Sequence, residues 1–320
     1  MSTASAVSAA SAAELLVDLP DGPKKRRRWR GRVAGGNNSS YPMWFYLPAG
    51  IFYLLLFLIP TGASFYFALT RWTLFDVEFI GLDNFVAFFN EQALVAGFTN
   101  TFIYAFLTSG AKVVLGMALG VLLASQLIGR GFLRSVIFFP VLVSTIGIGV
   151  TFKALLDPFD GVVNQALAAI GITGPGWLTD PQWALFSVAM VDVWKGVGLA
   201  TLIYLAGIAA IPQEYNEAAK VDGASSWQNF WHVTLPLLRP ATATVILLSL
   251  IGGLRSFDLI WTMTKGGPGF SSDVIASVIY KQYQAGFFGL STAGNVILFI
   301  VVAAIIFPLS AWLNRGSKES

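Results

Sequence analysis

Residues 217–223 read Glu-Ala-Ala-Lys-Val-Asp-Gly, and Val233-Thr234-Leu235-Pro236 follows after a further nine residues. The two alanines let a helix approach a partner closely, while the carboxylate of Glu217 can meet a cationic side chain there. Gly223 permits a sharp bend between two short helices, because glycine adopts backbone conformations that other residues avoid. Pro236 favours a helix start, since proline is tolerated in the first turn and not inside. The stretch predicts a helix–bend–helix suited to docking, or else a plain connector between longer helices.

The composition of the rest of the chain indicates a membrane protein. Hydrophobic residues make up 55% of the sequence, charged residues 12%, and the mean hydropathy is +0.68. A soluble domain carries about 25% charged residues, so this chain lacks the polar surface that water requires. The 26 Phe and 10 Trp are typical of a lipid-facing protein with aromatic rims.

Six apolar runs reach the length of about 20 residues that a helix needs to cross the hydrocarbon core. The predicted spans are Trp44–Leu69, Phe98–Ile128, Phe132–Leu156, Trp183–Ala210, Ala241–Met263 and Thr292–Trp312. Prolines inside or near the ends of these runs are expected to kink or cap the helices; they are Pro48, Pro60, Pro140 and Pro308. Arg255 and Asp258 interrupt the fifth run, so its boundaries are the least defined.

The distribution of basic residues predicts the orientation of these spans. With the N-terminus inside, the outer segments hold only Arg71, Lys265 and Lys281, and residues 157–181 contain no Lys or Arg. The inner segments hold many more, namely Lys24, Lys25, Arg26, Arg27, Arg28, Arg30, Arg32, Arg130, Arg134, Lys220, Arg239, Arg315 and Lys318. The positive-inside rule therefore places both termini and the Glu217 segment in the cytoplasm, with that segment between spans four and five.

The N-terminal basic run is expected to contact lipid rather than nucleic acid. It precedes the first span by about ten residues, a distance at which Lys and Arg meet anionic cytoplasmic headgroups. We therefore predict a disordered, basic cytoplasmic tail at residues 1–40, a membrane domain at residues 41–315 and a cytoplasmic end at residues 316–320. A cleaved signal peptide is not expected, because the first apolar run starts too late and is too long.

The spacing that begins at Glu217 resembles the cytoplasmic "EAA" loop of ABC-importer permeases, with Val233 where that family more often has Ile. Further stretches are similar to the carbohydrate permeases of the maltose and glycerol-phosphate type; they are Gly81–Phe85, Trp194–Ala206 leading into Ile211-Pro212, Leu254–Asp258 and Thr264–Gly269. The resemblance covers roughly residues 44–315. The chain lacks the large extracytoplasmic insertion of the enterobacterial maltose permease.

The resemblance implies an all-α polytopic fold with six transmembrane helices and a coupling loop at about residues 212–240. It also implies a bacterial cytoplasmic-membrane importer with a second, similar permease as heterodimeric partner, two ATPase subunits, an extracytoplasmic solute-binding protein and a sugar substrate. The residues expected to couple to the ATPase are Glu217, Ala218, Ala219, Asp222, Gly223, Ala224, Phe230, Leu235 and Pro236.

The sequence carries no catalytic constellation. There is no Cys and a single His, His232, so neither a thiolate metal site nor a His-rich cluster is expected. No Gly-x-x-x-x-Gly-Lys-Ser/Thr phosphate loop occurs, and the glycines at 266–269 are typical of a turn. We therefore expect no enzymatic activity and no cofactor bound by this chain, with ATP and Mg²⁺ held by partner subunits.

Ionisable residues inside the apolar runs are candidates for a polar translocation path. A charge at the bilayer centre costs roughly 3 kcal/mol or more, so these side chains should face water or one another. Within each of the pairs Asp192/Lys195 and Arg255/Asp258, the two residues are three apart and should share a helix face. Sugars also favour aromatic platforms. The predicted path comprises Asp192, Trp194, Lys195, Arg255, Phe257, Asp258 and Trp261.

Several alternatives stay open at this point. The intramembrane charges, which also include Lys112 and Lys153, can instead form interhelical ion pairs or snorkel to the interface. The aromatic residues, including Tyr280 and Tyr283, can be interfacial anchors. The solute can be a non-sugar such as glycerol phosphate. An ion-coupled secondary transporter would also carry buried charges, but it would not need an EAA loop.

Overall fold

The computed structural model describes residues 43–73, 75–125 and 127–315, and the chain divides into two compact units, Met1–Phe52 and Tyr53–Ser320. The tail predicted at residues 1–40 and the end predicted at residues 316–320 lie outside the described residues. In the first unit, the described part consists of η1 (Met43–Tyr46) and most of α2 (Leu47–Tyr53). Residues 44–52 are all exposed although most are apolar, as a lipid-facing helix requires.

The described residues contain four helices that are long and apolar enough to cross a membrane. They are Trp44–Phe67, Gln92–Ala124, Ala184–Ala209 and Phe288–Leu313. Trp44–Phe67 is built from the end of η1, α2, η2 (Leu54–Leu58) and α3 (Ile59–Phe67). These helices correspond to the first, second, fourth and sixth predicted spans. The predicted all-α, polytopic membrane fold is therefore confirmed.

The third and fifth predicted spans are broken helices, near the proline and the charged residues that the sequence analysis singled out. The third is a pair, α6 (Arg130–Leu142) and α7 (Thr145–Leu155), bent by 102°. Pro140 precedes this break and contributes no backbone N–H to the helix. The fifth predicted span, Ala241–Met263, is interrupted after α13 (Arg239–Leu254), and α14 (Asp258–Met263) follows as a separate short helix. If each bent pair counts as one span, the described chain crosses the membrane up to six times.

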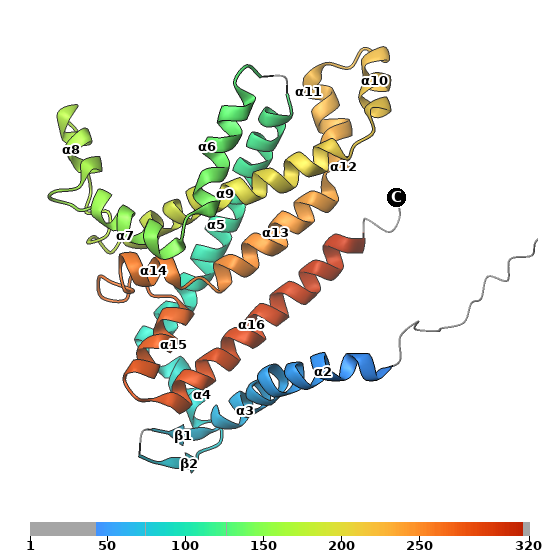
Figure 1. The fold of residues 1–320 in the computed structure, drawn as a ribbon. Coiled ribbons are helices and arrows are strands. Elements are labelled where there is room, and N and C mark those ends of the chain that lie inside the picture. The colour runs from blue at the N-terminus through green and yellow to red at the C-terminus, as the bar shows by residue number, and fades with distance from the viewer. Residues whose placement is uncertain (1–42, 74, 126, 316–320) are drawn as a thin grey trace, which may run out of the picture. The chain divides into compact units, whose positions relative to one another are not determined.

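The centre of the second unit is a close contact between α5 (Gln92–Ala124) and α9 (Ala184–Ala209). Glycines make this approach possible: a Cβ on Gly116 would lie 2.6 Å from the Cβ of Ala200, and one on Gly120 would lie 2.8 Å from the Cβ of Tyr204. Small residues allow such approaches between membrane helices, where dispersion replaces the hydrophobic effect. α13 packs against both helices, and α16 (Phe288–Arg315) packs against α13 (Figure 1).

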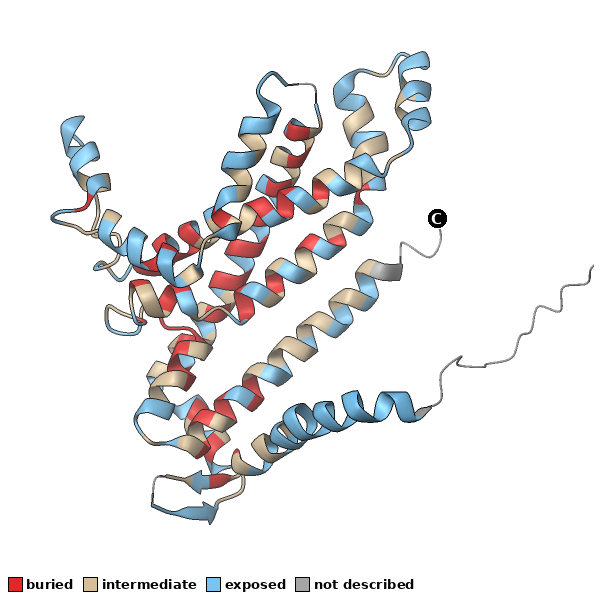
Figure 2. Cartoon of the chain, viewed as in Figure 1, coloured by how far each residue is buried: buried red, intermediate tan, exposed pale blue. Residues whose placement is uncertain are grey.

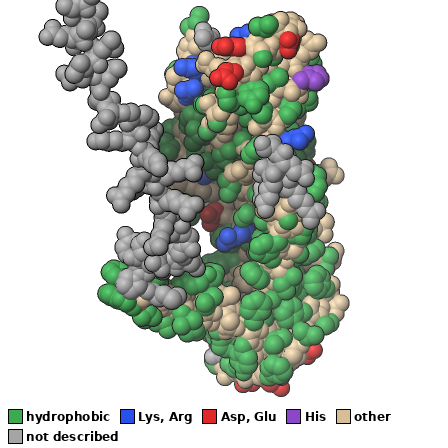
Figure 3. All heavy atoms as spheres, turned by 90° about the vertical axis from the view of Figure 1, so that its right-hand side faces the viewer, with side chains coloured by type: hydrophobic (Ala, Val, Ile, Leu, Met, Phe, Trp, Pro, Cys, Tyr) green, Lys and Arg blue, Asp and Glu red, His purple; other side chains and the backbone are tan. Residues whose placement is uncertain are grey.

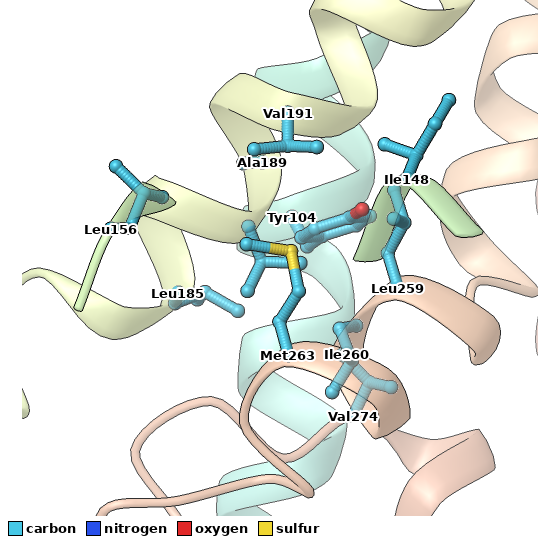
Figure 4. Packing of buried hydrophobic residues seen from close by; sticks show 11 residues of the cluster. Tyr104, Ile148, Leu156, Leu185, Ala189, Val191, Leu259, Ile260, Met263 and Val274 are labelled. Atoms are coloured by element: carbon cyan, nitrogen blue, oxygen red, sulfur yellow. The ribbon is translucent and has the colours of Figure 1, made fainter. Parts of the chain in front are cut away.

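Buried residues concentrate where these helices meet (Figure 2). The largest cluster joins Tyr104 of α5, Ile148 of α7, Leu185 of α9 and Met263 of α14 (Figure 4). The short helices α7 and α14 thus pack onto the long ones by burying their apolar faces. This cluster holds the chain after Arg255, whereas Leu250 and Leu254 of α13, before Arg255, pack in a separate cluster with Ala105.

The shorter elements of the second unit link its long helices. They are β1 (Thr70–Trp72), β2 (Val77–Phe79), α4 (Asp83–Asn90), α8 (Val162–Ala169) and α15 (Ile275–Gln284). The two strands pair antiparallel, with Arg71 opposite Glu78. Within this unit the α5–α6 connection and the α10–α11 loop lie at the end opposite the β1–β2 hairpin (Figure 1). These two connections therefore share one end of the unit, and the orientation of the spans stays a prediction.

The connection after α7 contains a local capping arrangement. The backbone N–H groups of Phe159 and Asp160 donate to Oδ1 of Asp157, at 2.9 Å and 3.0 Å. These two hydrogen bonds lower the pKa of the Asp157 carboxyl from its ordinary value, because they favour the ionised form. The carboxylate thus shapes a loop that is acidic and carries no compensating Lys or Arg.

Candidate functional site

The segment that contains Glu217 folds as two helices joined by a tight bend. We call residues 213–237 the EAA segment. Its first helix is α10 (Gln213–Val221), and its second runs from Ser226 to Leu237 through α11 (Ser226–Asn229), η3 (Phe230–Thr234) and α12 (Leu235–Leu237). The predicted bend is present at Gly223, whose φ is +77°.

Local hydrogen bonds explain why the chain turns at this point. The N–H of Ala224 donates to the carbonyl of Ala219 at 2.9 Å, and the N–H of Gly223 donates to that of Lys220 at 3.1 Å. This pair of bonds with a left-handed glycine is the Schellman motif, which satisfies the last carbonyls of a helix. A residue with a side chain would be strained at φ +77°. The sequence Asp222-Gly223 therefore fixes the end of α10.

The second helix begins with a capping box. Ser225 Oγ accepts from the N–H of Gln228 at 3.3 Å, and Gln228 Oε1 accepts from the N–H of Ser225 at 2.9 Å. The two helices are then tied together, because Asn229 Nδ2 donates to Oδ1 of Asn216 at 2.9 Å. Polar contacts within the EAA segment thus help to hold its two helices together.

The face that the EAA segment presents is exposed. Glu217, Ala218, Asp222 and Gly223 are exposed, while the other predicted coupling residues, Ala219, Ala224, Phe230, Leu235 and Pro236, are partly buried. A depression of about 500 Å³ between the two helices is lined by residues that include Ala218, Ala219 and Gly223. Charged side chains gather at this end of the molecule (Figure 3). Among the described residues Glu217 forms no salt bridge, so its carboxylate is free to meet a cation.

Aromatic residues of the second helix form an exposed cluster. The rings of Trp227 and Trp231 lie 5.4 Å apart, and Phe230 contacts both. Trp227 is 69% exposed, so the cluster is not part of the core. The second helix therefore has an apolar face at the surface. An exposed aromatic cluster beside a polar depression is typical of a docking surface.

Pro236 stands at a helix start, as predicted, but that helix is the short α12 and not the next long one. Pro236 lies in the first turn of α12, inside the helical run Ser226–Leu237, and the bend of 65° comes at Leu238, before α13. Proline is tolerated here because the preceding turn is a π-helix, in which the hydrogen-bond ladder is already shifted. A second proline, Pro240, occupies the first turn of α13.

The intramembrane charges are placed differently from the predicted pattern. Asp192 does not pair along α9 with Lys195: its Oδ2 lies 2.7 Å from Nζ of Lys112 on α5. The two side chains are only 18% and 9% exposed. Gly196 leaves room for the amine, because a Cβ there would lie 2.6 Å from Lys112 Cε. The interhelical ion pair that the sequence left open is therefore present.

Arg255 and Asp258 do not share a helix face, contrary to the prediction. Arg255 caps the end of α13 and Asp258 begins α14, so the chain bends between them. Both are exposed, and neither forms a salt bridge within the described part of the chain. The spacing of three residues implies a common face only where the helix is continuous. Whether either residue contacts a solute stays a prediction.

The predicted aromatic platforms fall into two groups. Phe257 and Trp261 stack at 5.7 Å, and Trp261 meets Tyr280 of α15 edge-on at 4.8 Å. A small pocket of about 270 Å³ next to them is lined by Phe257, Tyr280 and Tyr283. Trp194, by contrast, lies on α9 against Phe152, at 5.1 Å. The structure therefore brings Phe257, Trp261 and Tyr280 together and leaves Trp194 apart.

One well-defined polar site went unnoticed in the sequence. Asp273 is fully buried; its Oδ2 accepts from Lys281 Nζ at 2.6 Å and its Oδ1 from Ser277 Oγ at 2.7 Å. The glycine-rich turn wraps around this carboxylate, and Gly266 contacts it so closely that a Cβ has no room. The spacing Asp273–Ser277–Lys281, four residues each, is the helical signal that could have revealed the contact.

Comparison with known proteins gives a consistent result. Residues 113–319 match the model of a family described as the inner membrane component of binding-protein-dependent transport systems. The chain is 33% identical over 258 residues to the trehalose/maltose transport system permease protein MalF of Thermococcus litoralis, covering 80% of this chain and 88% of that protein. It is 31% identical to the probable ABC transporter permease protein YurN of Bacillus subtilis, covering 88% and 99%. A crystal structure of a bacterial ABC transporter that imports alginate contains a chain of the same fold, with a TM-score of 0.74, 24% identity, and 85% and 94% coverage.

Proposed function

Because the chain belongs to the family of inner membrane components of binding-protein-dependent transport systems, we propose that it is the permease subunit of an ATP-driven sugar importer. The observation that carries this proposal is the exposed EAA segment, whose bend at Gly223 is built into the backbone. An exposed, self-supported pair of helices with an unpaired carboxylate is suited to docking. If the EAA segment were only a connector between longer helices, it would not need both the Schellman motif and the capping box.

A sugar is the substrate class that we propose. Relatives of this chain carry names that refer to trehalose/maltose, arabinooligosaccharides and lactose transport. The stacked rings of Phe257 and Trp261 next to the exposed Asp258 offer an aromatic platform beside a hydrogen-bonding group. Sugar sites combine these two features, because a sugar has apolar C–H faces and hydroxyl edges. Glycerol phosphate, the alternative, would favour the cation of Arg255 over the aromatic rings.

The proposed assembly follows from what this chain lacks. Its sequence contains no phosphate-binding loop, so ATP and Mg²⁺ belong in two separate ATPase subunits. A second, similar permease would complete the path, and an extracytoplasmic binding protein would deliver the solute. Both termini and the EAA segment would then lie in the cytoplasm of a bacterial cell. No cofactor, nucleic acid or catalytic activity is assigned to this chain.

The coupling that we propose is mechanical. Closure of the ATPase dimer moves the EAA segment, and the second helix of that segment leads through the bend at Leu238 directly into α13. Since α13 packs on α5, α9 and α16, a displacement of the segment is transmitted to the helices around the path. The result is alternating access by a coupled rigid-body change.

The test of this proposal is retention of the ATPase by membrane-inserted variants. Glu217→Ala should weaken docking by about 2–5 kcal/mol if its carboxylate meets a buried cation of the ATPase. Gly223→Val should disrupt docking further, because valine is strained at the φ of +77°. The measurement is a pull-down of co-expressed ATPase subunits, together with sugar uptake by the same membranes.

A matched control is available on the same helix. Glu214 is also an exposed glutamate of α10, and it lies in the first turn, outside the predicted coupling set. Glu214→Ala should leave retention and uptake unchanged. Full retention with normal uptake in both the Glu217 and Gly223 variants would show that the EAA segment is only a connector.

A further inference from the structure

A groove lies where the EAA segment meets the C-terminal end of α16. It has a volume of about 840 Å³, within the range of roughly 300–1,000 Å³ that small-molecule sites occupy. Its lining includes Trp231 and Leu235 of the EAA segment, Arg239 and Thr242 of α13, and Trp312 and Leu313 of α16. Among the described residues, none of those that line the groove is acidic. The described part of the groove thus combines apolar walls with one positive charge, that of Arg239.

The position of the groove along the helices gives its depth in the membrane. The apolar span of α16 ends at Leu313, and the bend between the EAA segment and α13 lies at Leu238. Basic residues follow both positions, Arg315 after Leu313 and Arg239 after Leu238, so we place both walls at the depth where hydrocarbon gives way to the headgroup region. Trp231 and Trp312 are 46% and 68% exposed, and tryptophan is enriched at this depth.

The charge of the groove distinguishes among occupants. Arg239 is exposed and forms no salt bridge with any described residue. It is also the first residue of α13, a helix of 16 residues, so its guanidinium stands at the positive end of the helix dipole. Both features attract a phosphate, which Arg recognises through two parallel hydrogen bonds. The apolar walls below it accept acyl chains.

We propose that this groove binds an anionic phospholipid, with its phosphate on Arg239 and its acyl chains between the EAA segment and the end of α16. A lipid at this place would bridge the segment that docks the ATPase and the last membrane helix. Binding does not require that a sugar be the transported solute. If the topology proposed above holds, the lipid belongs to the inner leaflet, whose surface is negatively charged.

The test is native mass spectrometry of the full-length permease with the subunits that co-purify with it. The probes are palmitoyl-oleoyl phosphatidylglycerol and the zwitterionic phosphatidylcholine with the same chains. The wild type should retain phosphatidylglycerol about fivefold more tightly, the effect expected of one basic residue near a headgroup. Arg239→Gln should abolish this preference, and Arg239→Lys should keep most of it.

Arg130→Gln is the matched control. Arg130 is exposed and begins α6, so it stands at the same end of the second unit but outside the groove (Figure 1). Its substitution should leave the preference intact. Equal binding of both lipids by the wild type, or equal loss in the Arg130 variant, would overturn the proposal.

Two further arms separate other occupants. An excess of soluble glycerol phosphate should not displace the lipid; displacement would mean a site for a free phosphate ester. The preference should persist in the assembled complex, since its loss on assembly would mean that a partner subunit covers the groove. A last experiment keeps Arg239 and tests the location of the lipid. Brominated phosphatidylglycerol should quench the tryptophan fluorescence of the wild type more strongly than that of the Trp312→Phe variant, and equal quenching would contradict the location.

Discussion

Loss of one member of the Lys112–Asp192 pair is expected to destabilise the helix bundle strongly. Nζ and Oδ2 lie 2.7 Å apart, and the side chains are 9% and 18% exposed. At this distance and an effective dielectric constant of about 20, the Coulomb attraction is about 6 kcal/mol. Desolvation of each ion costs several kcal/mol, so the net contribution of the intact pair is small.

Although the intact pair contributes little, removal of only one partner is expected to cost much more, because it leaves the other ion buried without its counter-charge. Lys112→Met leaves the carboxylate of Asp192 without its cation, and Asp192→Leu leaves the ammonium of Lys112 without its anion. Each single variant should lose about 3–5 kcal/mol of unfolding free energy. The double variant should recover most of this loss, because two apolar side chains of similar volume replace both ions.

The assay is equilibrium unfolding in mixed detergent micelles, analysed as a double-mutant cycle. The exposed pair Arg71–Glu78, at 3.4 Å with side chains 63% and 61% exposed, is the control. Its disruption by Glu78→Ala should cost less than about 1 kcal/mol. The reasoning is refuted if each single variant at 112 and 192 costs no more than this control, or if the double variant loses the sum of both.

Three further predictions concern packing, topology and the solute path. Gly116→Val should cost about 1–3 kcal/mol by forcing α5 and α9 apart, whereas Gly110→Val on the same helix, with open space around it, should cost far less in the same unfolding assay. A single cysteine placed at Thr173, in a chain without native cysteine, should react with an impermeant maleimide in intact cells. A cysteine in the EAA segment should react only after permeabilisation, and the reverse pattern would overturn the topology. Arg255→Ala and Asp258→Asn should reduce sugar uptake while the complex stays assembled, and wild-type uptake in both would remove them from the path.

The local structure of the EAA segment was predictable because it is encoded locally. The glycine at 223 and the box from Ser225 to Gln228 act within a few residues of chain, and their hydrogen bonds are made within the segment itself. Span positions were predictable for a related reason. The requirement for about 20 apolar residues is a property of the solvent, and it leaves the same mark in any membrane sequence.

The rule that about 20 apolar residues form one span did not predict where helices break, because tertiary contacts support the broken helices. Apolar composition is continuous through Val143–Ser144, yet α6 and α7 bend by 102° there because α7 packs into the cluster with α9 and α14. In the fifth predicted span, Arg255 ends α13, and the burial of Leu259 and Ile260 holds α14 separately. Hydropathy measures affinity for lipid. It carries no information about which neighbouring helices can pack against a bent helix and stabilise it.

The sequence by itself determined that the chain is a membrane protein, where its long apolar helices lie and where the EAA segment bends. These features follow from composition and from contacts within a few residues. Only the tertiary structure decided that Asp192 pairs with Lys112, 80 positions away, and not with Lys195 on its own helix. It alone also decided that Arg239 and Trp312 line one groove. The reason is that a charge in a membrane is stabilised by whichever partner the packed helices bring within reach, and sequence spacing reports only the partners on the same helix.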